Sequence, residues 1–157
     1  MDAPKKIKPT RIIGIDYGKA RFGIAVSDET KLIAMPFATV QADIKSEKNA
    51  VKILDEVAKI AHEKHCEIEK IVVGMPLMMS GKFGLQADDV THFVKLLEEK
   101  TAIPVITWDE RLTTVQAEKS LREGSMSRKK RSKVIDKVAA VIILQNYLDS
   151  RFTQENC

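Results

Sequence analysis

Three short apolar segments follow one another near the start of this 157-residue chain, and they restrict the fold more than any other feature. The segments Arg11–Tyr17, Arg21–Asp28 and Leu32–Val40 have the length and the β-branched content of strands, and only a few residues separate them. Such short connections join antiparallel neighbours, because a parallel crossover needs about a dozen residues or more. The sequence therefore predicts a three-stranded antiparallel meander.

The apolar spacing after Val40 alternates between a helical period and short continuous runs. The expected elements are a helix over Ser46–Lys64, a strand over Lys70–Gly74, a helix over Gln86–Lys100, a strand over Pro104–Trp108, a helix from Thr113 or Thr114 to Leu121, and a closing helix over Ser132–Ser150. Ser46 or Asp43 is expected to cap the first helix.

Strands that alternate with helices pair in parallel through crossovers. We therefore predict an α/β, ribonuclease-H-like layout: a mixed five-stranded sheet in the order 3-2-1-4-5 with helices on both faces. A doubly wound Rossmann domain is the main alternative, but it would need a helix soon after the first strand, where none is indicated.

Length and composition fit one domain. The chain is long enough to bury a core without cross-links, and its 44% hydrophobic and 31% charged content is ordinary for a globular protein. We expect a flexible basic N-terminus over residues 1–10, a single domain over 11–150 and a C-terminal tail over 151–157. The net charge of +4 is modest, so local clusters of charge are more informative.

The two cysteines have no metal-ligand spacing and Cys157 is the last residue, so a reducing cytoplasm fits best. The Lys-rich N-terminus lacks the apolar core of a secretory signal. No apolar run approaches the ~20 residues that span a bilayer. We therefore expect a cytoplasmic protein with no membrane partner.

Asp16 is the first of three candidate site carboxylates. It follows Ile12–Ile15, which are apolar or glycine, and a carboxylate in that setting is costly to bury unless it is paired or bound to a metal. A strand-end aspartate that caps a turn is the simpler alternative.

The second candidate lies in the cluster Asp109-Glu110-Arg111, directly after a predicted strand. Strand residues alternate between faces, so only one of the two acids is expected to share a site with Asp16. Alternation alone leaves open which one, and a solvated turn is the alternative for the whole cluster.

The third candidate is Asp136 in the closing helix. Ala139 and Ala140 lie on its face one turn later, and such small residues let a helix approach the sheet closely. An exposed aspartate favoured by the helix dipole is the alternative.

The predicted topology lets these acids converge, because the first strand is central and the closing helix packs across it. Carboxylate oxygens suit Mg²⁺ or Mn²⁺, and a paired-metal site of this kind serves phosphodiester hydrolysis. The three histidines, His62, His65 and His92, are expected on helix surfaces, so no histidine-based site competes.

A basic stretch before the acid-bearing helix is the expected phosphate contact. We expect a flexible loop here, although such a run is a solvated loop in most proteins. Its cationic residues are Arg122, Arg128, Lys129, Lys130, Arg131 and Lys133. The loop Gly74–Gly81 is a further candidate edge of the cleft, and a plain connector is its alternative.

Four segments, GIDYGKARFGIAVSD, VVGMPLMMSGKFGLQA, DERLTT and DKVAAVIILQNYL, resemble in order and spacing the motifs of the YqgF/RuvX family of RNase-H-like nucleases. The resemblance runs from about Arg11 to Leu148. It implies a divalent-metal nuclease, with Asp16, Glu110 and Asp136 as the catalytic and metal-binding acids. The family usually has a Lys-Arg pair where this chain has Ala20-Arg21.

The resemblance also implies a nucleic-acid substrate. Precursor 16S ribosomal RNA and the assembling small ribosomal subunit are the expected partners of a monomer or weak homodimer. Lys19, which can restore the missing charge, Arg21 and Arg111 join the expected nucleic-acid contacts. The alternatives are a junction resolvase on branched DNA, a structured-RNA-binding assembly factor that does not cleave, and an actin-like ATPase, which would need two such domains.

Overall fold

The computed structural model describes residues 7–18, 20–75, 85–109 and 128–155, with side chains described from Asp88 in the second helix and over Val138–Arg151 in the last one. The elements are β1 (Thr10–Tyr17), β2 (Arg21–Ser27), β3 (Ala34–Gln41), α1 (Ser46–Glu63), β4 (Glu67–Met75), α2 (Leu85–Lys100), β5 (Val105–Asp109) and α4 (Arg128–Glu155). The helix expected over 113–121 lies outside the described residues.

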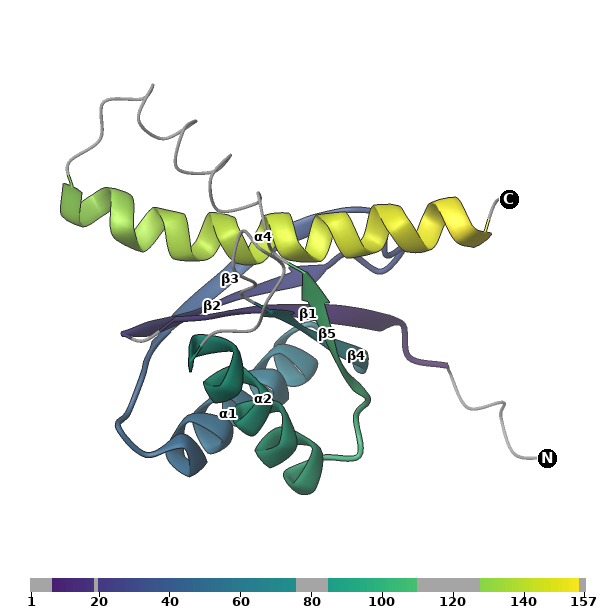
Figure 1. Cartoon of the computed structure of the whole chain (residues 1–157). Coiled ribbons are helices and arrows are strands. Elements are labelled where there is room, and N and C mark those ends of the chain that lie inside the picture. Colours follow the sequence, from purple (N-terminus) through teal and green to yellow (C-terminus); the bar gives the residue numbers. More distant parts are fainter. Residues whose placement is uncertain (1–6, 19, 76–84, 110–127, 156–157) are drawn as a thin grey trace.

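The five strands form one mixed sheet in the order β3-β2-β1-β4-β5, which confirms the predicted order. β1 pairs antiparallel with β2 and parallel with β4, and β5 continues the parallel side. Figure 1 shows α1 and α2 on one face and α4 on the other. The central strand is therefore covered on both faces, as its continuous apolar run requires.

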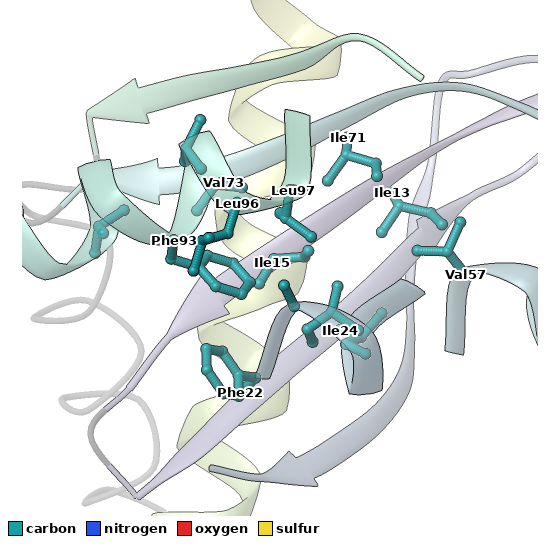
Figure 2. Close-up of a cluster of buried hydrophobic side chains, with 14 of the residues drawn as sticks. Ile13, Ile15, Phe22, Ile24, Val57, Ile71, Val73, Phe93, Leu96 and Leu97 are labelled. Atoms are coloured by element: carbon teal, nitrogen blue, oxygen red, sulfur yellow. The ribbon is translucent and has the colours of Figure 1, made fainter. Parts of the chain in front are cut away.

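Alternation along β1 divides the core into two layers. Ile13 and Ile15 pack with α1 and α2, and Figure 2 shows them among Phe22, Phe93 and Leu97 in this layer. Ile12 packs on the other face against the buried side chains of α4. Side-chain parity therefore tells which layer each strand residue faces.

The predicted side-chain cap of α1 is wrong. Lys45 occupies the N-cap position and makes no side-chain cap bond. Neither Asp43 nor Ser46 caps the helix; the Asp43 carboxylate accepts the N–H of Lys45 in the preceding loop instead, at 3.1 Å. The loop is closed by buried Asn49, whose side chain bonds both the N–H and the carbonyl of Asp43.

The three histidines are exposed, as expected, but His65 is not on a helix. It follows the end of α1 in the left-handed region, with φ of 49°. The N–H of Cys66 reaches back to the carbonyl of Ala61 at 3.1 Å, and that of His65 reaches His62 at 3.4 Å. These two hydrogen bonds form the pattern that closes a helix C-terminus when the residue after the C-cap is left-handed.

α4 is longer than predicted at both ends. It begins at Arg128, so the four basic residues Arg128–Arg131 belong to its first turn and not to a loop, and it ends at Glu155 rather than Ser150. Its C-terminal half is anchored on β4, where Lys70 Nζ donates to the Tyr147 hydroxyl at 2.8 Å and Arg151 pairs with Glu69 at 2.9 Å. No described helix is long and apolar enough to span a membrane.

Candidate active site

Asp16 lies at the C-terminal end of β1, the central strand, and it is partly exposed. Its partner across the antiparallel pair is Gly23 of β2, so no side chain stands opposite it. The strand ends after Tyr17 at Gly18, where a Cβ atom would strike the carbonyl oxygen of Arg21. Glycine is therefore required for the tight turn that ends the strand at this point.

Gly14 shows which face Asp16 belongs to. A Cβ atom on Gly14 would lie 2.7 Å from the Leu144 Cβ atom and 3.2 Å from the carbonyl oxygen of Ala140, so α4 rests on the β1 backbone here. Asp16 is two residues further on, and strand alternation assigns it to the same face. The small residues predicted to bring the helix close to the sheet include this Ala140, which is fully buried.

The direction of α4 brings its first half toward Asp16. Tyr147 of α4 bonds Lys70, which pairs with Ile12 near the start of β1, whereas Ala140 lies over Gly14. The helix therefore runs opposite to β1. Backbone position 136 precedes Ala140 by one turn, about 6 Å, and Asp16 follows Gly14 by about 6.6 Å along the strand. The side chain of Asp136 lies outside the described residues.

The acids after Trp108 are separated by strand parity. Ile106 and Trp108 pack in the α4 layer, and Val105 packs in the opposite one. Asp109, which is exposed at the end of β5, therefore has the parity of the α1–α2 layer, opposite to Gly14. Glu110 and Arg111 lie outside the described residues. β4 lies between β1 and β5, so the two acid-bearing strands are two positions apart in the sheet.

The predicted phosphate-binding residues are only partly described. Lys19, Arg111 and Arg122 lie outside the described residues. The basic residues Arg128, Lys129, Lys130, Arg131 and Lys133 occupy the first turns of α4, where only the backbone is described. Arg21 begins β2, is partly exposed, and pairs in register with Gln41 of β3. The described ranges contain no group of three His, Cys, Asp or Glu side chains close enough to hold a metal.

An aromatic cluster packs against the end of β1, at the residue that follows Asp16. The Tyr17 ring lies 4.9 Å from that of Phe22 and 5.2 Å from that of Phe93, measured between centroids. Burial, and then the carboxylate of Asp89, raise the pKa of Tyr17, so its hydroxyl stays neutral. Aromatic residues make up only 5% of the chain, and two of them, Tyr17 and Phe22, flank the β1–β2 turn. This placement is the one signal in the sequence that could have indicated the cluster.

The chain is similar to known proteins over most of its length. Residues 10–150 match the family described as RuvX, Holliday junction resolvase. A protein of Protochlamydia amoebophila is 58% identical over 93% of this chain and 97% of its own length, and one of Caldanaerobacter subterraneus is 47% identical over 90% and 97%. Both relatives are named "Putative pre-16S rRNA nuclease".

Solved structures share the fold at low sequence identity. Thermus thermophilus RuvC in complex with a Holliday junction substrate superposes with a TM-score of 0.52 at 16% identity, over 91% of this chain and 96% of that one. The fowlpox virus Holliday junction resolvase gives 0.53 at 13% identity, over 89% and 99%. The chain therefore has the ribonuclease-H-like fold predicted from its sequence and belongs to the RuvX family.

Proposed function

We propose that this protein is an endonuclease that hydrolyses phosphodiester bonds in the 5′-end maturation of pre-16S ribosomal RNA. One structural observation supports the proposal: Asp16 lies at the C-terminal end of the central strand, on the face that α4 covers at close contact. The names of the relatives supply the substrate. The assembling small ribosomal subunit is the proposed setting, and the buried free thiol of Cys66 suits a reducing cytoplasm.

We further propose that Asp16, Glu110 and Asp136 hold a divalent metal, Mg²⁺ or Mn²⁺. The donor set fits, because carboxylate oxygens are the ligands these ions prefer. Asp16 is partly exposed at the end of an apolar strand, so a cation can reach it without the cost of full burial. Such a metal supplies an activated water and stabilises the charge that develops on the phosphate.

The chain's own contribution is to position these groups and to bind the substrate. The contact of Gly14 with α4 sets the separation between β1 and the helix turn that contains position 136. Arg21 and the basic first turns of α4 are proposed to bind phosphates on either side of the cleaved bond. Such contacts give affinity without sequence choice.

The test uses purified protein and an RNA that spans the 5′ end of pre-16S ribosomal RNA. Asp16→Asn should lower the rate of Mg²⁺- or Mn²⁺-dependent cleavage by about 100-fold or more, while thermal unfolding and RNA binding stay at the wild-type level. Asp55→Asn, which changes an exposed acid of α1, is the matched control and should cleave normally. Full metal-dependent activity in Asp16→Asn would refute the assignment.

A junction resolvase is the second candidate, because the matched family carries that description. The same acids would serve both substrates, so competition between a four-way DNA junction and the RNA distinguishes them. A resolvase needs a symmetric dimer to cut two strands in register, whereas our proposal expects a monomer or weak homodimer by light scattering. Tight binding with no cleavage of either substrate would instead indicate an assembly factor that does not cleave.

A further inference from the structure

The loop between β3 and α1 is held by hydrogen bonds at the end of the sheet where β1 finishes after Asp16. Asn49 is 4% exposed, accepts the N–H of Asp43 at 2.6 Å and donates to the carbonyl of Asp43 at 3.0 Å. The N–H of Ala42 donates to the carbonyl of Ala20 at 2.9 Å, which ties the loop to the β1–β2 turn that follows Asp16. The conformation of the loop is therefore fixed relative to the candidate site.

This loop presents an apolar side chain to solvent. Ile44 is fully exposed, and Val51 in the first turns of α1 is 47% exposed. A single exposed apolar residue is ordinary. Here, however, the apolar side chain stands on a loop fixed by hydrogen bonds and among cationic side chains, so a partner could bind it without a large cost in loop ordering.

Cationic residues lie at the start of β2 and in the first turns of α1, on both sides of Ile44 in the chain. Lys52 Nζ donates to the carbonyl of Gln41 at 3.1 Å, which holds its ammonium group at the end of β3. Lys48 lies one turn earlier on α1, and Arg21 pairs in register with Gln41. Between Ala42 and Lys52 the chain has three lysines, Lys45, Lys48 and Lys52, and two acids, Asp43 and Glu47.

Asp43 moderates this positive charge but does not cancel it. The N–H of Lys45 donates to its carboxylate, and this hydrogen bond is the main cause that lowers the pKa of Asp43. Desolvation opposes it, and the charges of Lys48 and Lys52 add to the lowering. The carboxylate is therefore ionised, and it already accepts the Lys45 N–H. The outer ammonium groups of Lys45 and Lys48 are exposed.

The two faces of the sheet carry cationic groups at the same end. Arg21 and Gln41 lie at the end of the sheet where β1 finishes, and α1 starts from there on one face. The first turns of α4 lie at that end on the other face, as Figure 1 shows. A phosphate backbone laid across this end would pass Arg21 and the start of α1 on one face and the backbone of the basic segment of α4 on the other.

We propose that Ile44, Lys45, Lys48 and Lys52, called here the β3–α1 surface, extend the phosphate contact of Arg21 into a second nucleic-acid contact that binds the strand flanking the cleaved bond. The inference rests on the proposed nuclease function, whose substrate it extends. The lysines and Arg21 bind phosphates, and Ile44 packs against a sugar or a base.

The experiment measures binding of a labelled pre-16S ribosomal RNA fragment by fluorescence anisotropy in EDTA, over a series of KCl concentrations. Lys48→Gln/Lys52→Gln should raise Kd about tenfold near 0.1 M salt and lower the slope of log K against log salt by about 2, one for each lost phosphate contact. Ile44→Ser should raise Kd with an unchanged slope, because it removes an uncharged contact. Lys48→Gln alone covers the case in which loss of the Lys52 bond to Gln41 affects folding.

The matched control is Lys64→Gln/Lys100→Gln, which removes the same charge at the C-terminal ends of α1 and α2, away from Asp16. It should bind as wild type does. If wild type binds RNA and the Lys48/Lys52 pair behaves like this control, the β3–α1 surface is refuted and the nuclease proposal stands. If only binding to ribosome-assembly proteins is lost, the surface meets protein and the inference is also wrong. If wild type binds neither RNA nor a four-way junction, both proposals fail.

Discussion

Gly14 and Leu144 approach so closely that a Cβ atom on the glycine would lie 2.7 Å from the Leu144 Cβ atom. Real Cβ contacts are not this short, so α4 can rest here only because residue 14 has no side chain. The bare backbone of Gly14 therefore lies directly against the Leu144 Cβ atom and the Ala140 carbonyl, and this contact sets the separation of helix and strand. The same separation governs how far Asp16 stands from the helix turn that contains position 136.

Gly14→Ala should therefore affect both stability and catalysis. The added methyl group also meets the carbonyl oxygen of Ala140 at 3.2 Å, and neither backbone can give way cheaply. We expect a loss of about 2 kcal/mol in the free energy of unfolding, as for other overpacked cores, measured by urea denaturation. Below the unfolding transition, kcat should fall and the Kd for Mn²⁺ should rise, because α4 is displaced from β1.

Ile15→Val separates the two effects. This neighbour of Gly14 packs in the α1–α2 layer, and its truncation should cost about 1 kcal/mol without moving α4. Its kcat and Mn²⁺ affinity should match wild type. If Gly14→Ala lost stability but kept wild-type kcat and Mn²⁺ affinity, the contact would be structural only.

Most of the fold was predictable from short-range patterns. The runs around β1 to β3 contain mostly apolar and β-branched residues and have short connections, which leave only an antiparallel meander. Helix limits were harder, because the end of a helix depends on contacts from elsewhere in the chain. The polar run 128–131 looks like a loop by composition, yet it forms the first turn of α4, where no local break such as proline or glycine intervenes. The predicted side-chain cap of α1 was wrong because Asp43 bonds within the loop instead. Its carboxylate accepts the N–H of Lys45, and its own N–H donates to the Asn49 side chain.

The candidate site was predictable to a lesser degree. The apolar context of Asp16 is visible in the sequence, and so is the small Ala139–Ala140 pair that lets α4 approach the sheet. The choice between Asp109 and Glu110 cannot be made from the sequence, because alternation assigns a face only when the face of one reference residue in the strand is known. The packing of Trp108 in the α4 layer provides that reference. The charges near Ile44 belong to β2, the β3–α1 loop and α1, and only the folded sheet brings them together.

The two acids after Trp108 should differ sharply in their effect. Asp109 has the parity of the α1–α2 layer, opposite to Gly14 and Asp16. We expect Asp109→Asn to keep cleavage within a few-fold of wild type and Glu110→Gln to lower it by about 100-fold or more. Initial rates on the RNA substrate at saturating Mn²⁺, with unfolding curves of both variants, measure this. The reverse ranking would show that parity does not select the ligand.

His65→Gly should stabilise the protein. His65 has φ of 49°, a left-handed conformation that costs an L-residue about 1 kcal/mol and glycine little. Its side chain is exposed, so little packing is lost. The gain in the free energy of unfolding should approach about 1 kcal/mol, reduced by the greater freedom of glycine in the unfolded chain. His62→Gly in the last turn of α1 is the control and should destabilise, by about 0.3 kcal/mol. Equal effects of the two changes would contradict the strain at residue 65.

Asp28 should make the stability of the protein depend on pH at the acid end. Burial alone would raise its pKa, but hydrogen bonds from the Thr30 hydroxyl and from the N–H groups of Ile33 and Leu32 outweigh it and lower the pKa to about 2 from the usual 3.8. The folded state thus favours the charged form. The stabilisation is complete above the unfolded value and is lost as the pH falls toward 2.

The comparison of wild type with Asp28→Asn isolates this contribution. The amide oxygen of asparagine can still accept the Leu32 and Ile33 N–H groups, but it cannot ionise. Because Asp28 is partly exposed, screening by solvent reduces the effect to about 0.5 kcal/mol in favour of wild type at pH 6. Urea unfolding at pH 6, 4, 3 and 2 should show this difference shrink toward zero. Thr30→Val removes one donor to the carboxylate and so raises the folded-state pKa of Asp28, while the unfolded-state pKa is unchanged. The loss of stability in that variant should therefore be smaller and should be complete at a higher pH. A difference that stays constant from pH 6 to 2 would mean that the turn, and not the charge of Asp28, carries the stability.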